Sequence, residues 1–316
     1  MAERDKKQMA RVPRKAEILH GVSDSRLIAA YAAAQPWLRR TYVTGIGIGV
    51  VWESGKPTQE LGLSVHVRKR VPSAQLSERQ RFPRTLLGVR VDVVEANIKT
   101  HLSQAEVKAR RRVTADPLRP GVLIKAADGG LGTVGLLVRS RTNGQPFVLG
   151  SGHVLGQAGT TFFQPNPSAA NALRMTVLRV ERSRGDAGIA AYSGRPADNR
   201  PIGFSRLISS DRPVRFGDEL TMSGAFSGAT IGVVDWVGQR PIPYGGGVTI
   251  AIPGFQLRPR KAGQELTQPG DSGALWFDDA GSAVGINVGG EGGVHPWAFA
   301  SHITDMMSVL GVERQP

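Results

Sequence analysis

Cysteine is absent from this chain of 316 residues, which excludes a disulfide framework and a thiolate metal site. Aromatic residues make up 6%, and no apolar run reaches the length of about 18 residues that a membrane helix needs. The first residues are polar and charged, so no secretory signal is expected. A cytoplasmic location is the simplest interpretation, and the sequence predicts neither a cofactor nor a bound metal ion.

Acidic residues are the scarcer charge. The chain has 26 Asp and Glu against 40 Lys and Arg, a formal net charge of +14. Such an excess favours acidic partners and nonspecific contact with nucleic acid. The basic residues are spread over clusters at 4–15, 66–70 and 108–112, with no aromatic residues alternating among them. We therefore expect a basic surface and charged tails, and no dedicated nucleic-acid site.

The pattern of residues divides the chain into three segments. Residues 1–20 are charged and aperiodic, which predicts a disordered basic leader. Residues 21–113 combine an alanine-rich helical stretch with alternating apolar residues, which indicates a small α/β domain. The elements expected there are a helix at 25–40, strands at 43–52, 61–70 and 88–95, and a basic helix at 103–112. The isolated His66 and His101 are interpreted as surface or packing residues rather than ligands.

Residues 114–316 have a different texture, with short strands separated by Gly, Pro and Asp turns. This spacing predicts an antiparallel barrel or a pair of barrels, so the fold class is mainly β. The tripeptide at 142–144, Thr-Asn-Gly, indicates a hairpin turn. Strands are expected at 133–139, 146–149, 175–180, 187–192, 219–223, 230–237, 247–252 and 283–288, and a closing helix at 301–310.

The segment 268–277, Gln-Pro-Gly-Asp-Ser-Gly-Ala-Leu-Trp-Phe, suggests a nucleophile. Gly270 and Gly273 permit backbone turns that a side chain would block, and such turns can direct successive amide hydrogens to one point. A serine nucleophile needs such a point because its tetrahedral intermediate bears a negative oxygen, which each preorganised donor stabilises by about 3–4 kcal/mol. By itself, the tetrapeptide around Ser272 also fits an ordinary turn between two strands.

A serine hydroxyl becomes a good nucleophile when a base of near-neutral pKa takes its proton, which favours histidine. The imidazole in turn needs a buried carboxylate on its other nitrogen. His153 follows a predicted strand in a bed of small residues, and Asp186 stands at the start of an apolar strand. Both precede Ser272 in the chain and are the candidates for these two roles.

Together, three motifs resemble those of the chymotrypsin-like (trypsin-like) serine proteases. They are Leu-Gly-Ser-Gly-His-Val-Leu at 149–155, Asp-Ala-Gly-Ile-Ala at 186–190 and Pro-Gly-Asp-Ser-Gly-Ala at 269–274, in the order His, Asp, Ser. The resemblance spans residues 121–312. The segments 135–144 and 216–234 are most similar to cysteine-poor bacterial members and to the plant NARROW LEAF-type proteases. The resemblance implies a double β-barrel with an active site between the barrels.

The resemblance also implies a role for each residue. His153 is expected to act as general base and then acid, Asp186 to orient it, and Ser272 to attack the substrate. The amides of Gly270 and Ser272 are expected to form the oxyanion hole. The implied function is a serine endopeptidase that hydrolyses protein or peptide substrates through an acyl-enzyme.

The sequence departs from the family pattern at two places. Leu266, six residues before Ser272, stands where trypsins have an acidic specificity residue, which favours cleavage after an apolar residue. Leu266, Gly290 and His295 are the candidates for the substrate pocket. Many members have a serine after the nucleophile that supports the aspartate, and here Asn287 is the candidate for that support.

These departures leave a second hypothesis open, a catalytically silent scaffold or peptide-binding protein on the same fold. Because no zymogen-type prosegment is evident, control by homo-oligomer assembly, by a regulatory protein partner or by the N-terminal domain is expected.

Overall fold

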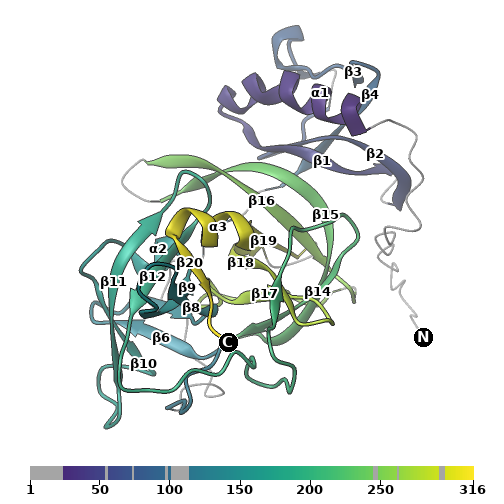
Figure 1. Cartoon of the computed structure of the whole chain (residues 1–316). Coiled ribbons are helices and arrows are strands. Elements are labelled where there is room, and N and C mark those ends of the chain that lie inside the picture. Colours follow the sequence, from purple (N-terminus) through teal and green to yellow (C-terminus); the bar gives the residue numbers. More distant parts are fainter. Residues whose placement is uncertain are drawn as a thin grey trace, which may run out of the picture.

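The structure is a computed structural model that describes residues 24–53, 56–72, 75–96, 99–100, 114–244, 248–261, 263–291 and 296–316. The predicted leader, the predicted helix at 103–112, His101 and His295 lie outside the described residues. The described part is built mainly from strands arranged in two sheets, of twelve and eight strands (Figure 1). The prediction of a mainly β fold is therefore confirmed.

The eight-stranded sheet forms the first barrel. In spatial order its strands are β20 (Val312–Arg314), β8 (Leu136–Ser140), β9 (Pro146–Gly150), β12 (Ala187–Ala191), β11 (Leu173–Glu181), β10 (Thr161–Gln164), β6 (Leu123–Ala126) and β7 (Leu131–Thr133). The predicted turn joins β8 to β9, and Gly144 there has a φ of 71°, which glycine adopts without steric cost. The C-terminal strand β20 pairs with β8, so the end of the chain returns to this sheet.

The second barrel is a closed ring of six strands, because β14 pairs with β15 as well as with β17. Around the ring the strands are β14 (Glu219–Gly224), β17 (Leu275–Phe277), β18 (Ser282–Glu291), β19 (Trp297–His302), β16 (Thr249–Pro259) and β15 (Gly228–Pro243). The short strands β13 (Ser210–Asp211) and β5 (Lys99–Thr100) also pair with β18. β15 and β16 extend beyond the ring as a long hairpin (Figure 1).

The helices are short. They are α1 (Asp24–Ala34), α2 (Gly152–Leu155), α3 (Ile303–Leu310) and the 3₁₀ helices η2 (Gln35–Arg39) and η4 (Glu78–Gln80). The helix expected at 25–40 changes to 3₁₀ geometry at Gln35, because Pro36 lacks an amide hydrogen and restricts the residue before it. The closing helix is present as α3, and its Ile303 and Met306 are buried in a cluster that joins residues of both barrels.

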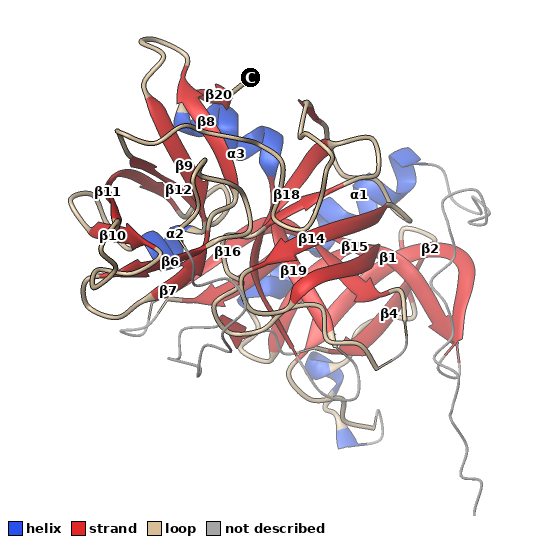
Figure 2. Cartoon of the chain, turned by 90° about the horizontal axis from the view of Figure 1, so that it is seen from below, coloured by secondary structure: helices blue, strands red, loops and turns tan. Residues whose placement is uncertain are grey.

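The N-terminal strands continue the sheet of the second barrel. β1 (Val43–Glu53) pairs with β2 (Lys56–Val67) on one side and with β15 on the other. β2 pairs with β4 (Val89–Glu95), and β4 pairs with β3 (Thr85–Leu86). Figure 2 shows β1 and β2 beside β15. The α/β segment therefore does not have a sheet of its own, although the strands expected there are present.

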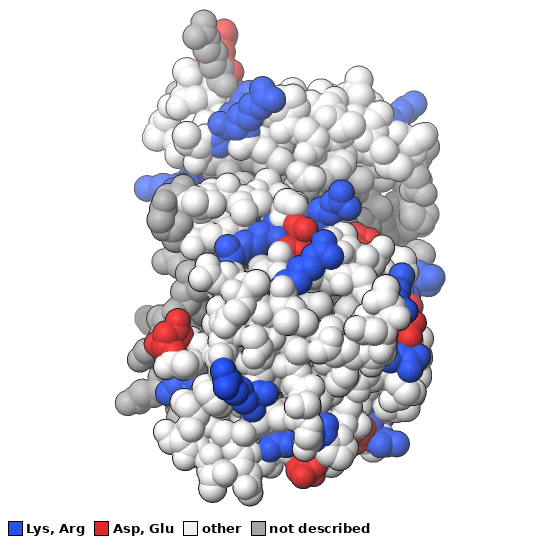
Figure 3. All heavy atoms as spheres, turned by 60° about the vertical axis from the view of Figure 1, so that its left-hand side comes forward, with Lys and Arg blue, Asp and Glu red and all other residues white. Residues whose placement is uncertain are grey.

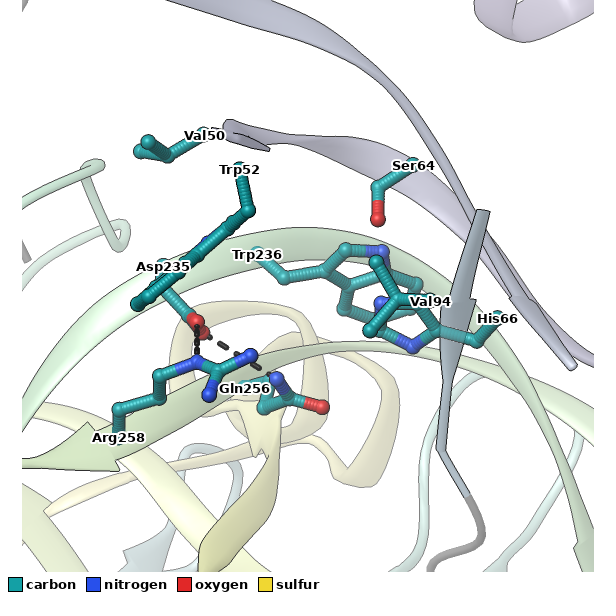
Figure 4. Close-up of a pocket in the computed structure, with 9 residues that line it drawn as sticks. All are labelled: Val50, Trp52, Ser64, His66, Val94, Asp235, Trp236, Gln256 and Arg258. Atoms are coloured by element: carbon teal, nitrogen blue, oxygen red, sulfur yellow. Dashed lines mark hydrogen bonds and ion pairs between the residues drawn. The ribbon is translucent and has the colours of Figure 1, made fainter. Parts of the chain in front are cut away.

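A buried polar cluster lies where β1 and β2 meet the β15–β16 hairpin (Figure 4). His66 stacks on Trp236 with ring centroids 4.9 Å apart, and Nη2 of Arg240 lies 2.5 Å from His66 Nδ1. A guanidinium has no acceptor, so Nδ1 must accept this hydrogen bond and the His66 ring is neutral. Asp235 accepts a hydrogen bond from Nε of Arg258 at 2.5 Å. His66 is thus a packing residue at this seam.

This cluster predicts that acid weakens the fold. Burial, and then the charges of Arg240 and Arg258, hold the pKa of His66 well below its ordinary value. Below about pH 6.5 the unfolded ring takes up a proton that the folded ring refuses, so the free energy of unfolding falls as the pH drops. We expect the full chain to lose stability in urea between pH 7 and pH 5. The stability difference from His66→Gln should shrink over the same range. Parallel pH curves for the two proteins would contradict this role for His66.

Candidate active site

His153 and Asp186 form a buried hydrogen-bonded pair. Nδ1 of His153 lies 2.5 Å from Oδ2 of Asp186, and the His153 amide donates to Oδ1 at 2.8 Å. Their side chains are 2% and 0% exposed. The sequence analysis expected His153 at the end of a strand. In the structure β9 ends at Gly150, and His153 lies in the following short helix α2.

Two neighbours, Gly152 and Ser301, fix the position of Asp186 beside the His153 turn. A Cβ built on Gly152 would lie 2.9 Å from Oδ1 of Asp186, so a larger residue would push the carboxylate away. On the other side, the amide of Asp186 donates to Oγ of Ser301 on β19 at 2.9 Å. Asp186 is therefore held between the His153 turn of the first barrel and a strand of the second.

The hydroxyl that contacts the Asp186 carboxylate comes from Ser151. Its Oγ donates to Oδ2 of Asp186 and lies 2.8 Å from Nδ1 of His153. The candidate for this support, Asn287, is elsewhere: its Nδ2 donates to Thr267 Oγ1 and to the Asp271 carbonyl. Asn287 supports the Ser272 loop, because its place on β18 directs it away from Asp186.

Burial alone would raise the pKa of Asp186. The opposite charge of His153 and the hydrogen bonds from His153 and Ser151 outweigh burial, so the pKa of Asp186 lies below its ordinary value. Asp186 is therefore ionised at neutral pH, as a carboxylate must be to stabilise an imidazolium.

The Ser272 loop connects β16 to β17, and glycine is needed on both sides of the serine. Gly270 and Gly273 each have a φ of 97°, in the region that favours glycine. Asp271 stands between Gly270 and Ser272. Its buried carboxylate accepts hydrogen bonds from the amides of Phe226 and Gln268, both at 2.8 Å. The loop is thus held from inside by its own aspartate.

Thr133, a residue that the sequence analysis missed, holds this loop from the first barrel. Its amide donates to the Ser272 carbonyl at 3.0 Å, and its Oγ1 donates to the Gly270 carbonyl at 2.8 Å. A Cβ built on Gly273 would lie 3.2 Å from the amide nitrogen of Ser151. The nucleophile loop therefore packs directly against the turn that leads to His153.

Tyr244, at the tip of the β15–β16 hairpin, was also missed. The Arg182 guanidinium lies 5.3 Å from its ring centroid, so the hairpin of the second barrel reaches the loop before β12. Burial, and then the charge of Asp186, raise the pKa of the Tyr244 phenol. A tyrosine next to a glycine run gave no sequence signal, because the length of the hairpin decides where its tip lies.

Ser272 and His153 share no hydrogen bond. Oγ of Ser272 donates to the Val288 carbonyl at 3.0 Å, and within the described part of the chain Nε2 of His153 has no hydrogen-bond partner. Among the described residues, the amides of Gly270 and Ser272 donate to no acceptor either. Two backbone donors of the Ser272 loop are thus without an acceptor among the described residues.

The two described substrate-pocket candidates, Leu266 and Gly290, both belong to the second barrel. Leu266 is 1% exposed in the core of the second barrel, because Thr230 Oγ1 holds its carbonyl at 2.9 Å. Its side chain therefore lines no open pocket. Gly290 lies on β18, where a Cβ would clash with the Trp297 carbonyl and with Thr267. The third candidate, His295, is not among the described residues.

The edge of β18 next to this site is occupied by the chain itself. Thr100 and Lys99 of β5 pair antiparallel with Gly289 and Gly290. The approach to β5 is anchored, since Ala96 is buried in the cluster around Trp236 and its carbonyl accepts from Thr44 Oγ1 at 2.5 Å.

On the face shown in Figure 3, Lys and Arg stand in separate groups with acidic residues among them. No three His, Asp or Glu side chains in the described part of the chain gather as a metal site requires. Among the described helices, none has the length and apolar character that a membrane span requires.

No protein-family model and no curated protein matches this chain. Solved structures do. The Nocardiopsis protease NAPase is 20% identical over 64% of this chain and all of its own, with a TM-score of 0.50. A glutamic acid specific serine protease, described as using a histidine triad in substrate binding, is 22% identical over 63% of this chain and all of its own, with a TM-score of 0.51. At this identity the likeness shows the fold, a chymotrypsin-like double β-barrel.

The contacts of Thr133 predict a cost for Thr133→Val. Valine keeps the shape but leaves the Gly270 carbonyl and the Ala225 amide without their buried hydroxyl partner. We expect the free energy of unfolding in urea to fall by about 1–3 kcal/mol. The matched control is Thr142→Val in the exposed β8–β9 turn, which should change it by less than about 0.5 kcal/mol. Equal losses in the two variants would argue against a supporting role for Thr133.

Proposed function

We propose that this protein is a serine endopeptidase in which Ser272 attacks the substrate carbonyl, His153 transfers the proton and Asp186 orients the base. The observation that carries the proposal is the buried His153–Asp186 pair, with 2.5 Å between Nδ1 and Oδ2, packed against a loop with two unpaired amides. The fold supports it, and the two solved neighbours described above are proteases by name. The likeness to the NARROW LEAF-type members, the cytoplasmic location and the domain boundary near residue 114 stay predictions.

The chemistry follows from these positions. As Oγ of Ser272 bonds to the carbonyl carbon, its proton passes to Nε2 of His153, and the oxyanion accepts from the amides of Gly270 and Ser272. The intermediate collapses, the C–N bond breaks and His153 protonates the leaving amine. Water then adds to the acyl-enzyme through the same base and releases the acid and Ser272.

The first step needs a small movement. The Ser272 hydroxyl must turn from the Val288 carbonyl toward Nε2 of His153, which exchanges one hydrogen bond for another. Catalytic hydrogen bonds are often long or misaligned until substrate binds. A peptide in the site would supply the carbonyl that draws the hydroxyl into place.

An extended peptide can bind such a site by adding a strand to an open sheet edge. The edge of β18 beside Ser272 offers Gly289 and Gly290, and Thr100 and Lys99 now pair with them. We infer that β5 competes with substrate, so the intact chain is a resting form of the enzyme. In the second candidate function, a peptide-binding protein without catalysis, the Ser272 hydroxyl would keep its hydrogen bond to the Val288 carbonyl.

Active-site labelling separates these two functions. A fluorophosphonate should modify Ser272 of the full chain, as located by peptide mass mapping, and Ser272→Ala should lose labelling and about 10⁶-fold in kcat on a peptide substrate. Asp186→Asn should cost about 10⁴-fold. Absence of labelling in the folded wild-type chain, with peptide binding retained, would establish the non-catalytic alternative.

Proline at positions 99 and 100 tests the competition by β5. Proline has no amide hydrogen and is excluded from a regular strand ladder, so the double variant Lys99→Pro/Thr100→Pro should free the edge of β18. Apparent affinity is reduced by the fraction of competent molecules. We therefore expect kcat/KM for an extended peptide to rise about tenfold or more, mainly through a lower KM.

The matched control is Lys99→Ala/Thr100→Ala, which keeps both amides and should retain the wild-type kcat/KM. If the proline and alanine variants have the same kcat/KM as the wild type, β5 does not compete with substrate for β18. That result would leave the proposal of hydrolysis by Ser272 unchanged.

A further inference from the structure

We propose that Ser151 is a positioning residue of the catalytic centre. Its hydroxyl holds His153 and Asp186 in the one arrangement that leaves Nε2 of His153 able to act as the base. The inference rests on the proposed function and adds to it a residue outside the catalytic triad.

The placement of Ser151 shows that its hydroxyl is committed to this pair. Ser151 is the N-cap residue of α2, a position where a serine side chain usually accepts from a helix amide. Here no such capping bond is made, and the side chain turns to Asp186 instead. The residue is 1% exposed, so the hydroxyl has no bulk water to bond with.

The protons in this cluster follow from the donors and acceptors. An ionised carboxylate can only accept, so the Ser151 hydroxyl proton points at Oδ2 of Asp186. The lone pairs of Oγ then face Nδ1 of His153 at 2.8 Å, and Oδ2 faces the same nitrogen at 2.5 Å. Two acceptors at Nδ1 require the proton there. Nε2 is therefore the unprotonated nitrogen, which is the state that a general base needs.

The Ser151 hydroxyl also stabilises the charged form of the Asp186 carboxylate. The hydrogen bond from Ser151 is one of the contacts that lower the pKa of Asp186, because it spreads the negative charge of Oδ2. Alanine at this position would take one donor from the buried Oδ2, which would keep only its contact with Nδ1 of His153 among these hydrogen bonds. With one donor fewer, the carboxylate would attract the charged imidazole more strongly and would orient the neutral ring with one contact fewer.

Two kinetic results are expected for Ser151→Ala in the full chain. Loss of a hydrogen bond to a charged group should lower kcat/KM by about ten- to a hundredfold, through kcat with KM nearly unchanged. The acid limb of the kcat/KM profile should move to higher pH, because the carboxylate then holds the imidazolium more tightly. Ser151→Thr, which keeps the hydroxyl, should restore both.

Ser301→Ala is the matched control. It removes another buried hydroxyl next to Asp186, one that accepts from the main-chain amide and does not touch the carboxylate. We expect it to lower the free energy of unfolding and to leave the acid limb where the wild type has it. A merely structural role for Ser151 would make the two alanine variants alike, with unshifted acid limbs, and would overturn the proposal.

An NMR measurement makes the test independent of turnover. The Nδ1 proton of His153 should give a downfield resonance in the wild-type chain that shifts or broadens in Ser151→Ala and persists in Ser301→Ala. An unchanged resonance in Ser151→Ala would refute the positioning role even if Ser272 proved catalytically silent. Failure of fluorophosphonate labelling with the resonance altered as expected would instead refute the protease and keep the Ser151 contact.

Discussion

The site depends on a single buried charge, the carboxylate of Asp186. A carboxylate without solvent is costly unless donors surround it, and an isolated one would take up a proton instead. The donors here include the amide and Nδ1 of His153 and the hydroxyl of Ser151, three groups from one turn of the first barrel. The hydrogen bonds that stabilise the Asp186 carboxylate therefore also fix the orientation of the His153 ring.

Asp186 also joins the two barrels. Its main-chain amide is bound by Ser301 of β19, while Thr133 of the first barrel holds the Ser272 loop of the second through two hydrogen bonds. Each barrel thus contributes a support for the functional residue of the other. A displacement of one barrel would disturb both Asp186 and Ser272, so the stability of the barrel interface and the geometry of the site are coupled.

Sequence reasoning located the parts of this site whose chemistry is local. His153, Asp186 and Ser272 stand in short motifs with small residues around them; the structure places Asp186 directly before β12, Ser272 in a loop between glycines, and His153 in α2 just after the end of β9. Ser151 and Thr133 could not be found in this way, because a serine or threonine in a strand or turn is common and its partner is decided by tertiary contacts. Asn287 was proposed as the support for Asp186 from its position after Ser272 alone. The sequence does not show the direction of its side chain on β18, which is toward Thr267 and the Asp271 carbonyl.

The fold shows the same division. Alternating or apolar runs predicted β1, β4, β11, β14 and α3, whereas the short strands β6, β10, β19 and β20 were not predicted. The pattern of the N-terminal segment indicated its strands but not their place in the sheet of the second barrel. The alternation of side chains along β1 is the same whether its edge faces water or pairs with β15, so it does not record which edge is covered.

The continuity of this large sheet relates the N-terminal segment to the nucleophile. β1 lies on the hairpin strand β15, and the chain that leaves β4 passes the buried Ala96 and reaches β18 as β5. There Thr100 pairs with Gly289, the neighbour of Val288, whose carbonyl holds the Ser272 hydroxyl. The strand edge that β5 fills and the carbonyl that binds the Ser272 hydroxyl thus belong to adjacent residues of β18. A peptide that displaced β5 would act on both at once, because its backbone would lie along β18 beside the hydroxyl that must turn.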